Sequence, residues 1–246
     1  NYLEDKSIKR FIFFYVQKKI ISSEIVIHEQ EEQNLILFVK SIKKQYPDSK
    51  VVQCTDLLTR KINGVDEIFR DDVDQDKMMV AKIYSFSQLK YNEPCLYLDT
   101  DMIMVKKIPF NLFINKAEVF LLNRSFNRNS FIPDKFRGKF FEEHLKETLG
   151  GIYPYIACFV ITKNNNFWKE CYEAIIKLSD NYKFWFGDQK VFKNMVKMNK
   201  FKFAFVEESD FACPPYYIDE KKTPYIIHFK GKEAKNLIKK YYDIIK

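Results

Sequence analysis

The chain has 246 residues, of which 46% are hydrophobic and 17% aromatic. This length can bury one full α/β core but not two large ones, so we expect a single domain over residues 1–246. Lys and Arg number 41 against 33 acidic residues, and the net charge of +8 favours anionic partners. No Arg-rich cluster, zinc pattern or aromatic RNA-binding motif supports a nucleic-acid-binding protein.

The five cysteines are scattered, and none forms a Cys-x-x-Cys pair. This pattern argues against a zinc site or a disulfide framework and favours reduced thiols in a cytoplasmic protein. No apolar run reaches the roughly 20 residues that a membrane-spanning helix needs.

Apolar runs and helical spacing alternate along the chain. The first strand is expected at residues 10–17, residues 22–28 are ambiguous, and a helix follows at 29–46. The pattern further predicts strands at 51–54, 95–98, 119–123, 155–162, 203–206 and 225–228, and helices at 76–89, 166–178, 188–198 and 233–245. Such alternation predicts a Rossmann-like, mostly parallel sheet flanked by helices. In such sheets ligands bind beyond the carboxyl ends of the strands.

An acidic pair follows the apolar run at residues 95–98. Asp99 and Asp101 emerge two residues apart at the end of this strand, before the apolar stretch 102–105. Two semi-buried carboxylates are unfavourable without a cation, and together they can hold a hard divalent metal that neutralises a diphosphate. The pair therefore predicts a metal-assisted reaction at a diphosphate.

Haloacid-dehalogenase-like phosphatases also place Asp-x-Asp after a strand and use the first Asp as the nucleophile, which would be Asp99 here. Those enzymes normally have Thr or Val two residues after the second Asp, where this chain has Ile103. They also place the motif on the first strand of the core. The phosphatase hypothesis stays as the alternative.

The segment Tyr97-Leu98-Asp99-Thr100-Asp101 resembles that of GT-A glycosyltransferases, most closely the retaining group of bacterial lipopolysaccharide galactosyltransferases and glycogenin. The resemblance covers roughly residues 10–236. It implies a GT-A fold, transfer of a sugar from a nucleotide-diphosphate donor to a glycan or glycolipid, and a Mn²⁺ or Mg²⁺ cofactor. It also implies that Asp99, Thr100 and Asp101 bind the donor diphosphate through the metal.

Three further segments follow in the order that the resemblance requires. Lys82, on the helix before the acidic pair, takes the place of a basic residue that reaches the donor. The pair Asp188 and Gln189 opens a later helix and would lie against the donor sugar, close to the reacting carbon. Between them, residues 153–162 resemble a family strand that opens with Asn-Ala-Gly, of which only Ala157 is retained.

The last segment resembles a closing His-x-x-Gly motif. His228 would complete the metal site with Asp99 and Asp101, and Gly231 and Lys232 would contact the diphosphate. The family continues to a lysine where this chain has Ala234, so Lys230, Lys232 or Lys235 would supply the second positive charge.

By the same resemblance, the end of the first strand at Tyr15, Val16 and Gln17 would lie under the nucleotide base. An aromatic side chain there can stack on uracil, which favours a UDP-sugar, although the residues themselves do not separate uracil from guanine. A non-catalytic carbohydrate- or nucleotide-binding relative is a further alternative, against which the intact Asp99–Asp101 pair argues.

Two segments suggest how an acceptor is reached. Residues 125–151 lie between the metal strand and the catalytic helix, a natural position for an acceptor loop or lid. Residues 232–246 fit an amphipathic helix that either packs on the domain or lies peripherally on an anionic membrane at the inner face, near a lipid-linked acceptor.

Overall fold

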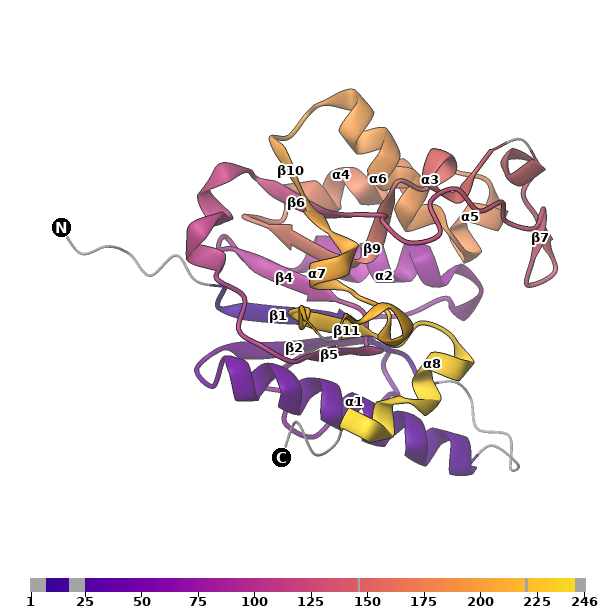
Figure 1. The fold of residues 1–246 in the computed structure, drawn as a ribbon. Coiled ribbons are helices and arrows are strands. Elements are labelled where there is room, and N and C mark those ends of the chain that lie inside the picture. The colour runs from indigo at the N-terminus through magenta and orange to yellow at the C-terminus, as the bar shows by residue number, and fades with distance from the viewer. Residues whose placement is uncertain (1–7, 18–24, 146, 220, 242–246) are drawn as a thin grey trace.

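The structure is a computed structural model that describes residues 8–17, 25–145, 147–219 and 221–241. Its centre is a sheet of seven strands with helices on both faces (Figure 1). The strands are β1 (Arg10–Phe14), β2 (Lys50–Thr55), β3 (Glu67–Arg70), β4 (Cys95–Leu98), β6 (Val119–Asn123), β9 (Tyr155–Thr162) and β10 (Phe203–Glu207). The predicted α/β class is confirmed.

The strand order is β10-β6-β9-β4-β1-β2-β3. β1 pairs in parallel with β2 and β4, β2 with β3, and β6 with β10. Only β9 runs the other way, antiparallel to both β4 and β6. The sheet is therefore mostly parallel, as predicted, and the ends of β1, β2, β4 and β6 meet at one edge.

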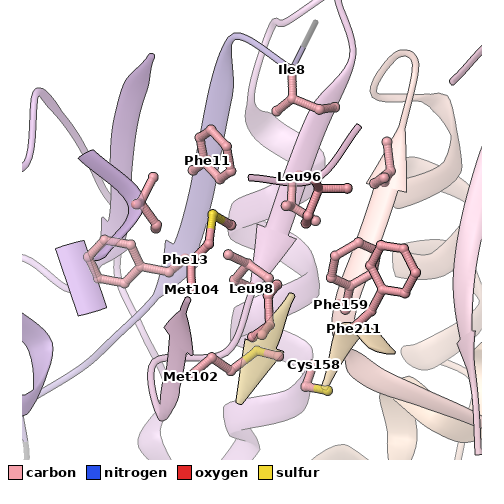
Figure 2. Packing of buried hydrophobic residues seen from close by; sticks show 14 of the residues in the cluster. Ile8, Phe11, Phe13, Leu96, Leu98, Met102, Met104, Cys158, Phe159 and Phe211 are labelled. Atoms are coloured by element: carbon pink, nitrogen blue, oxygen red, sulfur yellow. The ribbon is translucent and has the colours of Figure 1, made fainter. Parts of the chain in front are cut away.

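Alternation along the strands builds a core on each face of the sheet. Phe11 and Phe13 of β1 join Leu96 and Leu98 of β4 in one cluster (Figure 2), and the intervening Ile12 lies in the other. Successive side chains of a strand point to opposite faces, so strands that are apolar throughout are buried on both.

Each face is covered by its own helices (Figure 1). α1 (Ile25–Gln45) contributes Leu35, Phe38 and Ile42 to the first cluster. The opposite face carries α2 (Met78–Gln88), α4 (Asn166–Ile175) and α6 (Gly187–Met198), which pack on one another and fill the second cluster.

A short antiparallel ladder lies on the α1 side of the sheet. β5 (Met102–Met104) pairs with β11 (Ile226–His228), and Met102 and Met104 contribute to the first core cluster. This ladder brings the end of the chain back beside the acidic pair. The sequence analysis expected β11 but not β5, which is only three residues long.

Short elements make up the connections. They are β7 (Lys135–Phe136), β8 (Lys139–Phe140), α3 (Leu149–Ile152), α5 (Asp180–Phe184), α7 (Glu208–Phe211), α8 (Lys232–Asn236) and the 3₁₀ helices η1 (Gln75–Lys77), η2 (Phe110–Leu112), η3 (Ile114–Lys116), η4 (Glu142–Leu145), η5 (Pro215–Tyr217) and η6 (Ile238–Tyr241).

The C-terminal segment differs from the predicted helix at 233–245. α8 ends at Asn236, η6 follows, and residues 242–246 lie outside the described part of the chain. Ala234 and Ile238 are each 2% exposed and pack against Leu37 and Phe229, so the apolar side of the segment faces the domain. Among the described residues no helix has the length and apolar character needed to cross a bilayer.

Candidate metal and donor site

The site lies at the edge where the parallel strands end. β1 and β4 are neighbours in a register that pairs Phe13 with Leu98, so Asp99 leaves β4 beside the end of β1. The N–H of Asp99 donates to the carbonyl oxygen of Cys158 on β9 at 3.0 Å. This bond fixes the first carboxylate to the centre of the sheet.

The short ladder places the second carboxylate and the histidine. His228 pairs with Met102, and the N–H of Phe229 donates to the carbonyl oxygen of Asp101 at 2.8 Å. As a result Nε2 of His228 lies 3.2 Å from Oδ1 of Asp101. Asp101 and His228 are far apart in sequence and come together only through this ladder.

Asp99, Asp101 and His228 together form a set of possible metal ligands. One ligand atom from each lies within 4.8 Å of the other two. Carboxylate oxygens and an imidazole nitrogen suit Mn²⁺ and, with more oxygen ligands from a diphosphate or water, Mg²⁺. The possible ligand atoms of Asp99, Asp101 and His228 therefore fit the predicted divalent cation.

Lys82 joins this set to the start of α6. Its Nζ lies 3.1 Å from Oδ1 of Asp99 and 3.2 Å from Oδ2 of Asp188. The Lys82 side chain is only 11% exposed, so it does not project from the helix into solvent. A nearly buried lysine between two carboxylates belongs to the site.

Electrostatics hold these groups in their charged forms. Burial alone would lower the pKa of Lys82, but Asp99 and Asp188 raise it above its ordinary value. Burial would also lower the pKa of His228, but contacts with the Cys158 thiol and the Asp101 carboxylate raise it well above the usual range. For Asp101, burial is outweighed by His228 and Lys235, which lower its pKa to about 2.

α6 begins with an unusual backbone that presents Asp188 and Gln189. Phe186, at the N-cap, has φ of 64°, a left-handed conformation that costs a bulky residue energy. The following Gly187 packs so closely that an added Cβ would lie 2.2 Å from the carbonyl oxygen of Tyr182. Asp188 is 5% exposed, and its Oδ1 accepts the N–H of Gln189 at 2.8 Å.

The closing segment supplies a second lysine. Nζ of Lys235 lies 3.6 Å from Oδ2 of Asp101, so this lysine contacts the acidic pair. Gly231 precedes α8 with φ of 89°, which glycine adopts at little cost. Lys230 is exposed, and the side chain of Lys232 lies outside the described part of the structure.

The end of β1 lies at the same edge of the sheet as Asp99. The N–H of Tyr15 donates to the carbonyl oxygen of Cys54, and the N–H of Gln17 donates to Oγ1 of Thr59 at 2.8 Å. Val16 is 9% exposed. Burial, together with Glu31 and Glu32, raises the pKa of the Tyr15 hydroxyl, so the ring is neutral.

Two features of the site were not predicted. Arg124, directly after β6, is 5% exposed and donates from Nη2 to Oε1 of Gln189 at 2.7 Å. A single arginine after a strand carries no motif, and its partner lies 65 residues away. The aromatic residues before α6 pack on residues 131–153: Trp185 stacks on Phe136, and Phe186 stacks on Tyr153.

His144 has a structural position in this packing. It is 2% exposed, and its ring nitrogens make hydrogen bonds with the carbonyl oxygen of Pro133 and the hydroxyl of Tyr153. The side chain of His28 lies outside the described part of the structure.

No protein-family model matches the sequence, and a search of curated proteins finds no significant match. Solved structures do match. The galactosyltransferase LgtC, crystallised with donor and acceptor sugar analogues, is 13% identical with a TM-score of 0.54, over 90% of this chain and 87% of LgtC.

Two larger proteins match as well. The glycosyltransferase GlyE of Streptococcus pneumoniae is 13% identical with a TM-score of 0.55 over 93% of this chain, and the bifunctional glycosyltransferase WbbM is 12% identical with a TM-score of 0.58 over 100% of it. The chain spans 56% of GlyE and 50% of WbbM. These likenesses show that the chain has the fold of GT-A-like glycosyltransferases such as LgtC.

Proposed function

We propose that this protein is a metal-dependent glycosyltransferase that moves a sugar from a nucleotide-diphosphate donor to a glycan or glycolipid acceptor. The observation that carries the proposal is the cluster of Asp99, Asp101 and His228 at the carboxyl edge of the sheet, next to the buried Lys82. Open α/β sheets bind ligands at this edge, and the glycosyltransferase fold supports the same activity.

In this proposal Asp99, Asp101 and His228 hold Mn²⁺ or Mg²⁺. A bound divalent cation supplies Lewis-acid neutralisation of the diphosphate as its bond to the sugar breaks. Lys82 and Lys235 contact the two carboxylates and add positive charge around the same point. Thr100 lies between the ligands and contributes its backbone to this turn. Preorganised charges of this kind stabilise the leaving group without reorganising during the reaction.

Asp188 and Gln189 orient the donor sugar. Lys82 connects the Asp188 carboxylate to Asp99, so the start of α6 is held beside the diphosphate-binding residues. No Asp or Glu stands out as the general base that an inverting enzyme requires, and the resemblance to retaining enzymes supports retention of configuration. Tyr15, Val16 and Gln17 would form the base-binding end, with a UDP-sugar favoured, and Gly231 with Lys232 would close over the diphosphate.

The acceptor remains a glycan or a lipid-linked glycan in this proposal, because LgtC was crystallised with an acceptor sugar analogue and has the same fold. The described residues of the segment 125–151 pack beside the start of α6, where the rings of Phe136 and Phe141 contact that of Phe186. In this proposal the segment contacts the acceptor. The expected contact with an anionic membrane would rely on lysine side chains of the C-terminal segment, because Ala234 and Ile238 pack on the domain.

The direct test is metal-dependent turnover of nucleotide sugars. We expect a panel of UDP- and GDP-sugars to be hydrolysed slowly, and transferred in the presence of acceptor glycans, with Mn²⁺ or Mg²⁺ and not with EDTA. Asp99→Asn and Asp101→Asn should lose activity and remain folded, because each keeps the size of the side chain, although each removes an ion pair with Lys82 or with His228. Asp48→Asn, an exposed carboxylate before β2 at the opposite edge, is the matched control and should behave like the parent.

Equal activity in EDTA and in Mn²⁺ would overturn the metal-dependent reaction. The phosphatase alternative predicts a different outcome, namely release of inorganic phosphate from a phosphate monoester with Asp99 as the nucleophile. No contact in the structure favours that alternative, and the fold matches reported above are to glycosyltransferases.

A further inference from the structure

Arg124 connects three parts of the chain in the interior of the site. Its backbone N–H donates to the carbonyl oxygen of Pro154 at 2.9 Å. Its Nε donates to the carbonyl oxygen of Tyr153 at 2.8 Å, and its Nη2 donates to Oε1 of Gln189 at 2.7 Å. The side chain thus links the end of β6 to the start of β9 and to the first turn of α6.

These contacts determine the orientation of the Gln189 carboxamide. A guanidinium has only hydrogen-bond donors, so the atom of Gln189 that faces it must be the carboxamide oxygen. The carboxamide NH₂ group then points away from Arg124. Among the described residues, none accepts a hydrogen bond from this nitrogen. The nitrogen is also not one of their buried polar atoms that lack a partner, so it is accessible from outside.

The charge on Arg124 is balanced within the protein. Glu208 on α7 is 6% exposed and accepts the N–H groups of Ser125 and Phe126, which follow Arg124, at 2.9 Å each. Burial lowers the pKa of Arg124, and the negative charge of Glu208 opposes that shift. A buried guanidinium with a carboxylate nearby and two carbonyl-type acceptors remains charged and fixed in one geometry.

We infer that Arg124 is a positioning residue. By binding the carboxamide oxygen of Gln189, it orients the NH₂ group of Gln189 toward the substrate. The inference rests on the proposed function. Gln189 would then act on the reaction as a hydrogen-bond donor, and its partner would be an oxygen acceptor, such as a hydroxyl or ring oxygen of the donor sugar or an oxygen of the acceptor. Gln189 adjoins Asp188, which Lys82 connects to Asp99, so such an oxygen would lie beside the diphosphate site.

A double-mutant cycle tests whether Arg124 acts through Gln189. Arg124→Met and Gln189→Ala are each expected to lower kcat about 10- to 100-fold, with a smaller change in the KM of the donor, since misplacement of a positioned group costs rates of this order. The double variant should be no slower than Gln189→Ala alone. Lys200→Met, which removes an exposed cation beyond the far end of α6, should match the parent. Fully additive losses would show that Arg124 acts independently of Gln189 and would overturn the inference.

Gln189→Glu separates the two ends of the carboxamide. A carboxylate at this position still accepts from Arg124 but cannot donate to the substrate, so the variant should be about as slow as Gln189→Ala. If Gln189→Glu keeps the kcat of the parent, the working atom is the oxygen, and the inference is wrong. If Arg124→Met does not fold, Arg124→Lys serves instead, because it keeps a charge beside Glu208 and cannot make both side-chain bonds.

A measurement without substrate separates failure of the inference from failure of the proposed function. The ¹³Cδ chemical shift of Gln189, assigned by its loss in Gln189→Ala, reports the hydrogen bond to the carboxamide oxygen. We expect this shift to move in Arg124→Met or Arg124→Lys and to stay unchanged in Lys200→Met. An unchanged shift in both Arg124 variants overturns the contact even in an active transferase. A changed shift in a protein that transfers no sugar leaves the contact in place and rejects the transferase.

Discussion

His228 and Asp101 form a largely buried pair within the proposed metal site. The imidazole lies 3.2 Å from the Asp101 carboxylate, and the two side chains are 6% and 20% exposed. Two carboxylates close together repel each other, so a proton on His228 and the ammonium groups of Lys82 and Lys235 hold the charge in balance. A bound cation would take over part of this role.

Metal binding is therefore expected to release a proton from His228. The raised pKa of His228 keeps its imidazole protonated above pH 6.5, where an ordinary histidine is neutral, and a metal ligand must be neutral. Below the folded-state pKa, affinity for Mn²⁺ should rise about tenfold for each unit that pH rises. Calorimetry at pH 7.5 in buffers of different ionisation enthalpy should find that Mn²⁺ binding releases protons.

The raised pKa of His228 also makes the stability of the protein without metal depend on pH. A raised histidine pKa stabilises the fold below the ordinary value of about 6.5, and this contribution is lost as pH rises through the folded-state pKa. Asp101, with its pKa lowered to about 2, stabilises the fold at pH values above the ordinary pKa of an aspartate, and this contribution is lost as pH falls toward 2.

In His228→Ala the proton release should disappear and Mn²⁺-supported nucleotide binding should weaken roughly 10- to 100-fold. Mn²⁺ binding without proton release in the parent would remove His228 from the ligand set.

At the scale of single residues, the sequence predicts those site residues that belong to a recognisable motif. Asp99, Asp101 and His228 are marked by strand ends and by a family resemblance, and the structure brings them together. Arg124 is marked by nothing, because its role depends on the packing of β6, β9 and α6 against one another. The contact of Lys235 with Asp101 likewise depends on how α8 packs beside the acidic pair.

At the scale of elements, the start of α6 carries most of the strain in the site. Phe186 adopts a left-handed conformation and is held there by stacking on Tyr153, with ring centroids 4.8 Å apart. Gly187 allows the first turn to approach α5. The strained residue and the close contact together set where Asp188 and Gln189 lie, which places backbone strain next to the residues proposed to orient the sugar.

Gly187→Ala tests the importance of this close contact. Alanine is normally about 1 kcal/mol better than glycine in a helix, yet its Cβ would lie 2.2 Å from the carbonyl oxygen of Tyr182. We expect a loss of about 1–3 kcal/mol in the free energy of unfolding in urea, because backbone must move to admit the methyl group. Lower kcat should accompany it, since α6 carries Asp188 and Gln189.

Gly138→Ala is the matched control for that variant. Gly138 has φ of 77° and open space around its Cβ position, so alanine there adds backbone strain without a clash. Its effect on stability should be smaller than that of Gly187→Ala. If Gly187→Ala were as stable as the parent, the close packing of α5 on α6 would not determine the position of the site.

Elements with strong patterns were predictable, and elements defined by their partners were not. The strands at 119–123 and 155–162 have the predicted limits, because uninterrupted apolar runs specify buried strands. β3 was missed because Glu67–Arg70 is a short edge strand with half-exposed side chains. The reversed direction of β9 follows from chain connectivity, which no local pattern records.

At the scale of the molecule, the functional groups lie on elements spread over most of the chain. Lys82 comes from α2, Asp99 from the end of β4, Asp188 from α6 and His228 from β11. A site assembled in this way forms only when the whole domain is folded. A ligand that contacts all these elements should therefore stabilise the entire domain against unfolding.

Thermal unfolding can test this link without knowledge of the donor sugar. A ligand at 100 times its Kd adds about 2.7 kcal/mol of stability, and a chain of this size gains roughly 2–4 °C in Tm for each kcal/mol. UDP with Mn²⁺ is thus expected to raise the Tm by about 5–10 °C, GDP by less, and either nucleotide in EDTA by little. Asp99→Asn should lose most of the increase and Asp48→Asn should keep it. If neither nucleotide changes the Tm in Mn²⁺, the nucleotide-sugar donor is wrong, because a ligand that bridges α2, β4 and β11 must make unfolding of the domain more costly.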